Sequence, residues 1–143
     1  MLVSQILKSK TAGMIHISPE AKVSDAVAML SERRIGALIV SSDGLRCEGI
    51  LSERDIVREL GKRGPSVLDE QLSSIMTAKV IGCASGDTTI AVLQRMTDGR
   101  FRHMPVLDGD KVVAVISLGD VVKARLEELA AEKDALEGMI KGY

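Results

Sequence analysis

The feature that most constrains this chain is an internal duplication. Residues 48–60 and residues 112–125 share one order: an apolar strand, then a Ser-x-x-Asp motif, then a helix. Upstream of these segments, residues 37–40 align in the same way with residues 103–106. A repeated unit of this size buries too little apolar surface to stand alone, so the two copies are expected to pack face to face.

Each copy is predicted to contain a strand, a helix, two strands joined by a turn, and a second helix. Apolar runs rich in β-branched residues predict the strands, and apolar positions three and four residues apart predict the helices. The predicted fold class is therefore α+β, built from two β-α-β-β-α repeats. The predicted strands are residues 14–17, 37–40 and 47–51 in the first copy, and residues 80–83, 104–107 and 112–116 in the second.

The chain divides at a break between the two copies. Gly61-Lys-Arg-Gly-Pro65 is rich in residues that end helices and strands, so this stretch is expected to begin a linker. The expected organisation is a first repeat at residues 1–60, a linker at 61–71, a second repeat at 72–126 and a C-terminal helix extension at 127–143.

The last helix is predicted to continue well past the point where its counterpart in the first copy ends. Its apolar positions are spaced alternately four and three residues apart, as in a coiled-coil seam interrupted by one lysine. Because barely three heptads are present, two interpretations remain open: an amphipathic helix that lies on its own domain, or a dimer contact. The seam comprises Val122, Leu126, Leu129, Lys133, Leu136 and Ile140.

Composition and charge exclude several function classes. The 19 Lys and Arg residues balance 20 Asp and Glu, so no overall field favours nucleic acid or an anionic membrane. One Tyr, one Phe and no Trp leave no stacking platform for single-stranded nucleic acid. No apolar run reaches the roughly 18 residues of a membrane span, and the first residues lack a signal-peptide pattern. A cytoplasmic protein without a nucleic-acid or membrane partner is therefore expected.

The nucleophilic and metal-ligating residue types do not suggest a catalytic site. Cys47 and Cys83 each lie inside an apolar strand-like segment, which favours buried thiols, and two unclustered histidines make no convincing metal set. The sequence has no G-x-S-x-G elbow and no P-loop. We therefore expect no enzyme activity, no metal and no catalytic cofactor, and we interpret the scattered Lys62 and Lys79 as solvated surface residues.

The two Ser-x-x-Asp motifs, Ser52 to Asp55 and Ser117 to Asp120, are the first candidate binding feature. A Ser at a helix N-cap with an acid three positions later is close to a capping box, which needs no ligand. Both copies fall at a strand-to-helix junction, where helix amides and a hydroxyl can meet an anion or a sugar. A carboxylate there can also accept hydrogen bonds from a ribose diol. Both interpretations stay open.

The segment before each middle strand is the second candidate binding feature. Gly36 and Ala37 in the first copy are small enough for a flat ring to approach the backbone, whereas Arg102 and His103 in the second offer donors to a phosphate. The alternative is a solvated rim without a ligand. Two binding sites formed in this way would differ chemically.

Taken together, these patterns resemble a pair of CBS (cystathionine β-synthase) domains. The resemblance covers nearly the whole chain, apart from the C-terminal extension, and it implies a free-standing Bateman-type module of two repeats with pseudo-twofold symmetry. Such modules bind adenosine-containing ligands, such as AMP, ADP, ATP, NAD or S-adenosylmethionine, in clefts between the repeats. The segments that carry the resemblance are residues 35–40, 49–57, 102–106 and 114–122.

The resemblance also implies particular binding residues. In such modules the aspartate of the motif holds the ribose, the adenine lies against strands of the opposite repeat, and basic residues meet the phosphate. One cleft would then be formed by Ser117, Asp120, Ile15, Gly36 and Ala37. The other would be formed by Ser52, Asp55, Ile81, Arg102 and His103.

The function implied is a non-catalytic regulatory module, a homodimer, that binds an adenine nucleotide and signals to a target protein that the sequence does not identify. A second hypothesis is a constitutive oligomerisation scaffold whose clefts are vestigial and whose helix from Val122 to Ile140 mediates assembly. A third, an enzyme that hydrolyses nucleotides, lacks a base, a metal set and a nucleophile in the sequence.

Overall fold

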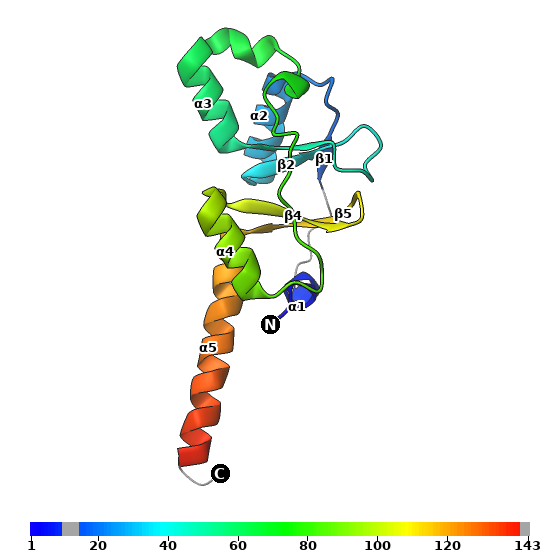
Figure 1. The fold of residues 1–143 in the computed structure, drawn as a ribbon. Helices are drawn as coiled ribbons and strands as arrows, with labels where there is room; N and C mark the ends of the chain where they lie inside the picture. The colour runs from blue at the N-terminus through cyan, green and yellow to red at the C-terminus, as the bar shows by residue number, and fades with distance from the viewer. Residues whose placement is uncertain (10–14, 141–143) are drawn as a thin grey trace.

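The two repeats form two stacked halves, and a long helix projects from the second half (Figure 1). The structure is a computed structural model that describes residues 1–9 and 15–140. Its mixed α+β architecture is the one predicted from the sequence. In chain order the elements are α1 (Val3–Ser9), β1 (His16–Ile17), α2 (Val23–Arg33), β2 (Ala37–Val40), β3 (Gly49–Ser52), α3 (Glu53–Arg63), η1 (Pro65–Asp69), η2 (Leu72–Ser74), α4 (Thr89–Gly99), β4 (His103–Asp108), β5 (Lys111–Ser117) and α5 (Leu118–Ile140).

The first half is built on a three-stranded sheet in the order β1-β2-β3. Strand β1 is parallel to β2, with His16 opposite Ile39, and β2 is antiparallel to β3, with Ala37 opposite Ser52. This confirms the hairpin predicted between the second and third strands. All four residues of β2 are buried, so the sheet centre belongs to the core. The predicted first strand begins at Met14, which lies outside the described residues.

The second half has a two-stranded antiparallel sheet, β4-β5, and here the prediction of a strand at residues 80–83 is wrong. Only Cys83 pairs with the sheet, through one parallel bridge to Val106. Its N–H donates to the Pro105 carbonyl (3.0 Å), and its carbonyl accepts from Leu107 N–H (2.7 Å). The next hydrogen bond of a parallel ladder would need an N–H from Pro105, which proline lacks. The segment therefore runs extended without forming a strand.

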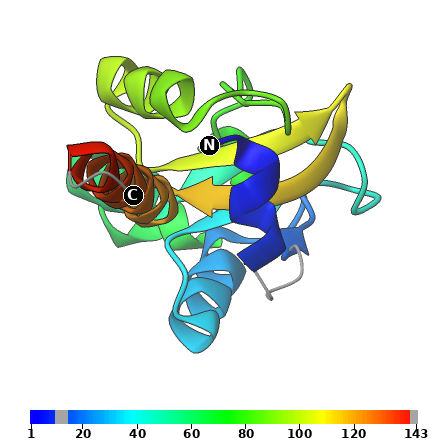
Figure 2. The same cartoon turned by 90° about the horizontal axis from the view of Figure 1, so that it is seen from below.

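Each half has its own hydrophobic core, and each core takes in a segment from the other end of the sequence. Val67, Leu72 and Ile75, which follow α3, are buried in the core of the first half. Val3 and Ile6 of α1 are buried in the core of the second half, where α1 lies against the β4-β5 sheet (Figure 2). Because the segments are exchanged, neither core is complete without both halves of the chain.

The turn between β2 and β3 contacts the turn between β4 and β5, and this contact joins the two halves. Both turns lie at the ends of the strands that are far from the N-termini of α3 and α5. Cys47 N–H donates to the Asp110 carbonyl (3.1 Å), and Val112 N–H donates to the Leu45 carbonyl (2.8 Å). An exposed ion pair between Arg46 Nε and Asp110 Oδ2 (3.1 Å) adds to this contact. The halves are thus fastened at one end of their strands, and the helix starts border the space at the other end.

The long helix α5 is anchored to the second half over its first three turns. Val121 and Ala124 are buried, and the Glu128 carboxylate accepts hydrogen bonds from Thr89 Oγ1 (2.8 Å) and Arg125 Nη1 (2.7 Å). Burial alone would raise the pKa of Glu128, but the hydrogen bonds from the amino terminus, Arg125 and Thr89 outweigh it and lower the pKa to about 2. The carboxylate is therefore ionised across the physiological range and ties α5 to α4.

From Leu126 onward, the apolar seam of α5 is not covered by any part of the chain that the structure describes. Leu126 is 61% exposed, Leu136 59% and Ile140 85%. The interpretation of a helix lying on its own domain is therefore wrong for this part of α5. None of the described helices combines the length and apolarity that a membrane crossing requires.

Candidate functional site

A cavity of about 610 Å³ lies between the two halves at the N-terminus of α3. We call it the Asp55 cleft. The first half contributes the end of β3 and the start of α3, and the second half contributes the extended segment between η2 and α4 and the connection from α4 to β4. The cleft brings together all five residues that the sequence assigned to one of the two clefts, namely Ser52, Asp55, Ile81, Arg102 and His103.

The Asp55 carboxylate caps the helix that follows it. Its Oδ2 accepts hydrogen bonds from Ser52 N–H (2.9 Å) and Ser52 Oγ (3.1 Å), and Asp55 N–H donates to Ser52 Oγ (3.3 Å). Its Oδ1 accepts from Arg58 Nη2 (3.0 Å), and the residue is only 7% exposed. The capping-box interpretation of this motif is therefore confirmed.

Capping does not exhaust the acceptor capacity of Asp55. A carboxylate offers about four lone-pair positions, and the three donors from Ser52 and Arg58 occupy three of them. The remaining position is on Oδ1, and Asp55 lines an open cavity rather than a filled interface. The motif can therefore cap α3 and still accept a hydroxyl from a bound molecule.

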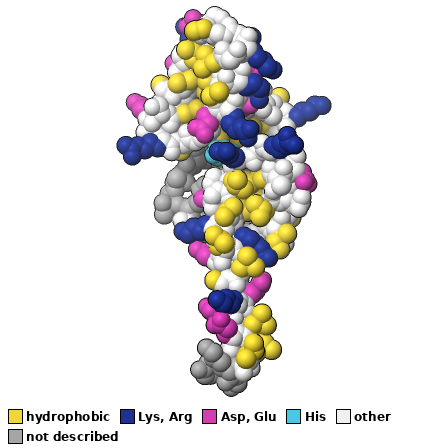
Figure 3. Space-filling view, turned by 90° about the vertical axis from the view of Figure 1, so that its left-hand side faces the viewer, with side chains coloured by type: hydrophobic (Ala, Val, Ile, Leu, Met, Phe, Trp, Pro, Cys, Tyr) yellow, Lys and Arg dark blue, Asp and Glu magenta, His cyan; other side chains and the backbone are white. Residues whose placement is uncertain are grey.

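The Asp55 cleft is strongly cationic. Five basic side chains line it against the single carboxylate of Asp55: Arg54, Arg58, Lys79, Arg100 and Arg102. Figure 3 shows Lys and Arg side chains gathered at the junction of the two halves, beside a histidine. Most of this set could not be predicted from the sequence, because these basic residues are scattered along the chain and come together only in the folded structure. Lys79, for example, was interpreted as an ordinary surface residue. Lys79 is indeed exposed, but it borders the cleft.

One wall of the cleft is apolar. Ile81 is 53% exposed, and Ile50, Phe101 and Pro105 line the same cavity. These side chains come from both halves of the molecule. Together they provide the apolar surface that a flat aromatic ring requires, next to donors for a charged group.

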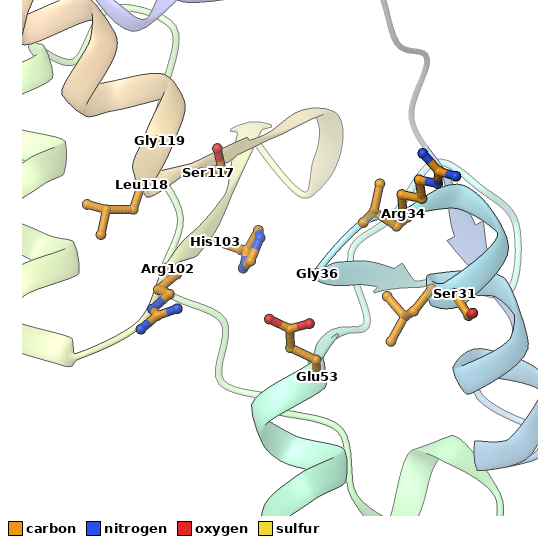
Figure 4. Close-up of a pocket in the computed structure, with 11 residues that line it drawn as sticks. Ser31, Arg34, Gly36, Glu53, Arg102, His103, Ser117, Leu118 and Gly119 are labelled. Carbon is orange, nitrogen blue, oxygen red and sulfur yellow. The ribbon is translucent and has the colours of Figure 1, made fainter.

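A second cavity, of about 640 Å³, lies at the N-terminus of α5, and it assembles only part of the other predicted cleft. Gly36 and Ser117 line it, whereas Ile15, Ala37 and Asp120 do not. Ala37 is buried in β2, and Ile15 packs against the first core. Figure 4 shows Glu53 and His103 projecting into the space between the halves, with the Ser117 strand on one side and Gly36 on the other.

The Ser117 motif also forms a capping box, and Gly36 has a packing role. Ser117 N–H donates to Asp120 Oδ2 (2.8 Å), and Asp120 N–H donates to Ser117 Oγ (3.1 Å). A Cβ atom at Gly36 would lie 2.7 Å from Cε1 of His103. The small residue thus makes room for the His103 ring of the other half. Arg102 and His103 line both cavities.

The potential metal ligands and the two free thiols, Cys47 and Cys83, are dispersed in the part of the chain that the structure describes. Residues 1–9 and 15–140 contain no group of three or more His, Cys, Asp or Glu side chains placed to hold a metal ion. Burial raises the pKa of the Cys83 thiol to about 11 and also raises that of Cys47, so neither forms a ready thiolate.

Comparison with known proteins places these features in one family. The family model for the CBS domain matches residues 3–62 and 72–127. The chain is 31% identical to the CBS domain-containing protein CBSX3, mitochondrial, of Arabidopsis thaliana, over 98% of this chain and 72% of that protein. The crystal structure of a CBS-domain containing protein from Agrobacterium tumefaciens superposes with a TM-score of 0.82, at 36% identity, over 87% of this chain and 99% of that one.

Other similar proteins differ more in sequence or in length. The CBS domain pair of protein MJ0100, in complex with 5′-methylthioadenosine and S-adenosyl-L-methionine, has a TM-score of 0.77 at 21% identity, over 90% of this chain and 98% of that one. At this identity the likeness concerns the fold. The Arabidopsis protein CBSCBSPB3 is 26% identical over 96% of this chain, which spans 25% of its length. The matched region is thus a module that also occurs within longer proteins.

Proposed function

Because this chain belongs to the CBS domain family, as a pair of CBS repeats, we propose that it is a non-catalytic sensor of an adenosine-containing ligand. The ligand binds in the Asp55 cleft, and its presence is signalled to a target protein. The observation that carries the proposal is the meeting of Ser52 and Asp55 from one repeat with Ile81, Arg102 and His103 from the other around one open cavity.

Each part of an adenine nucleotide has a counterpart in the cleft. The ribose hydroxyls donate to Oδ1 of Asp55, and the adenine ring lies against Ile81 and the apolar wall. Arg102 and His103 face the phosphate. AMP, ADP, ATP, NAD and S-adenosylmethionine all contain the adenosine part, so each is a candidate on this argument alone.

Binding can act as a signal because the ligand contacts both repeats. The hairpin turns fasten the repeats at one end, and the cleft lies at the other, where a ligand bridges Asp55 of α3 and Ile81 of the second half. A ligand with different affinity for two arrangements of the repeats shifts the population toward one of them. A target protein that contacts both repeats then distinguishes the two arrangements.

A thermal unfolding screen tests the proposal. A ligand at about 100 times its dissociation constant stabilises the folded state by about 2.7 kcal/mol, which raises the melting temperature by roughly 5–10 °C for a chain of this size. We expect such a shift with at least one of AMP, ADP, ATP, NAD and S-adenosylmethionine. The absence of a shift with every adenosine compound at millimolar concentration would contradict the proposal.

The exposed seam of α5 favours a second function, assembly. Isolated helices of this length are marginal in water, so the uncovered part of α5 needs a partner surface. Its heptad spacing suits the same helix of a second copy, which makes the protein a homodimer. If the Asp55 cleft were vestigial, this contact would leave a constitutive scaffold as the function.

Truncation after Arg125 tests the role of this seam. The shortened chain lacks the exposed Leu126, Leu129, Leu136 and Ile140, so light scattering is expected to show a monomer where the full chain shows a dimer. The buried Val121 and Ala124 are retained, so the second half keeps these contacts to α5, whereas the hydrogen bonds of Glu128 to Thr89 and Arg125 are lost. A truncated chain that is still dimeric at the same concentration would place the dimer contact elsewhere.

We also propose that the protein acts in the cytoplasm, without nucleic-acid or membrane partners. The balanced charge of the chain, with 19 Lys and Arg against 20 Asp and Glu, supports the part of the proposal that concerns nucleic-acid and membrane partners. A relative, CBSX3, carries the word mitochondrial in its name. Fractionation of cells that produce the protein distinguishes the two locations.

A further inference from the structure

We propose that the Asp55 cleft selects its ligand by charge, and that it takes an adenosine polyphosphate in preference to an uncharged or cationic adenosine compound. The inference rests on the proposed function, because it names the ligand class of the same cleft. It goes further in excluding S-adenosylmethionine as the preferred ligand.

Positive charge exceeds negative charge inside the cleft. The carboxylate of Asp55 is already paired with the Arg58 guanidinium (3.0 Å), and Arg58 also lies 3.6 Å from Glu59. Apart from Arg58, none of the five basic side chains forms an ion pair with a carboxylate among residues 1–9 and 15–140. Four positive charges, on Arg54, Lys79, Arg100 and Arg102, therefore border one cavity without a partner of opposite sign.

The fold brings these positive charges together from separate segments of the chain. Lys79 lies in the extended segment between η2 and α4, and Arg100 and Arg102 lie in the connection from α4 to β4. Arg54 of the first half donates from Nη1 to the Arg100 carbonyl (3.0 Å), which fixes this connection against the start of α3. The Arg100 backbone is left-handed, with φ of 56°, as it ends α4. Arg100 and Arg102 thus stand on a connection that is held to the first half at the rim of the cleft.

The positive rim attracts ligands of negative charge and repels ligands of positive charge. Like charges at short range repel, and a polyphosphate between them replaces repulsion by attraction. A neutral nucleoside gains nothing from the rim, and the sulfonium of S-adenosylmethionine adds a further positive charge. The second cavity carries less positive charge, because its two arginines, Arg34 and Arg102, are opposed by the carboxylate of Glu53. The charge selection is therefore strongest in the Asp55 cleft.

Isothermal titration of the full chain with ATP, adenosine and S-adenosylmethionine at low and high salt tests the inference. At about 50 mM NaCl we expect ATP to bind about tenfold to hundredfold more tightly than adenosine, and S-adenosylmethionine to bind more weakly than adenosine. Raising the salt should weaken ATP binding and leave adenosine binding nearly unchanged, because mobile ions screen exposed charges.

A charge-matched pair of variants separates the cleft from the net charge of the protein. Lys79→Glu is expected to weaken ATP binding about tenfold or more and to leave adenosine binding within about twofold. Lys62→Glu changes the net charge equally, but Lys62 lines neither cavity, so it is expected to leave both affinities unchanged. Equal effects of the two variants on ATP would overturn the inference, as would S-adenosylmethionine binding as tightly as ATP, while the sensor function would stand. Failure of all three compounds to bind would overturn both.

Discussion

Replacement of Asp55 by alanine is expected to weaken binding of ATP about tenfold to hundredfold and to destabilise the fold by about 1 kcal/mol. The first effect follows from the loss of a charge-assisted hydrogen bond to the ribose, which is worth about 1.5–3 kcal/mol. The second follows because Asp55 Oδ2 accepts the Ser52 N–H at the start of α3. Titration calorimetry and urea unfolding measure the two effects separately.

Two further variants distinguish binding from capping. Asp55→Asn retains an oxygen that can accept the Ser52 N–H, so stability should be largely kept while affinity for ATP falls. Asp25→Asn is the matched control, since the Asp25 carboxylate accepts the Lys22 N–H (3.1 Å) at the start of α2 and lines neither cavity. It should not change affinity. If Asp55→Asn binds ATP as tightly as the unaltered protein, Asp55 is a capping residue alone.

Replacement of Leu72 by alanine is expected to lower the free energy of unfolding by about 2–5 kcal/mol, the range for truncating a fully buried leucine. Leu72 is 0% exposed, and although it begins the second repeat in the sequence it packs in the core of the first half. Urea unfolding measures the loss. Hydrogen exchange should then show reduced protection in α2, whose Val23, Ala26 and Leu30 lie in the same core.

Leu45→Ala provides the control for this experiment. Leu45 is 59% exposed in the first hairpin turn, so its truncation should change the free energy of unfolding by no more than about 0.5 kcal/mol. Protection lost only from α4 and β4 in Leu72→Ala, with α2 unaffected, would contradict the exchange of segments between the cores.

The repeat fold could be predicted from the sequence because the same order of strands and helices occurs twice, so each copy supports the assignment of the other. The segment Ala37–Val40 was predicted with the bounds that the structure gives to β2. The strand predicted at residues 80–83 failed for a local reason, because Pro105 stands where the first repeat has Ile39 and cannot donate to the ladder. The exchange of α1 and the segment after α3 left no signal, since apolar periodicity indicates that a residue is buried but not in which core.

The candidate site could be predicted only in part, and for a physical reason. The Ser-x-x-Asp motif identifies a helix start, so the positions of Ser52 and Asp55 followed from local pattern. The rim of Lys79, Arg100 and Arg102 depends on how a connection in one repeat faces a helix of the other, which a single sequence does not encode locally. The packing role of Gly36 could not be predicted either, because its contact with the His103 ring arises only when the two halves meet.

The central claim is that an adenosine ligand binds between the two repeats at the start of α3. Mapping of amide chemical shifts in the ¹⁵N-labelled protein during titration with ATP tests it most directly. The account predicts saturable shifts concentrated at residues 52–58, 79–81 and 99–103, which face the cleft from both halves. Shifts confined to one half and away from these residues, or no shifts at millimolar ATP, would contradict it.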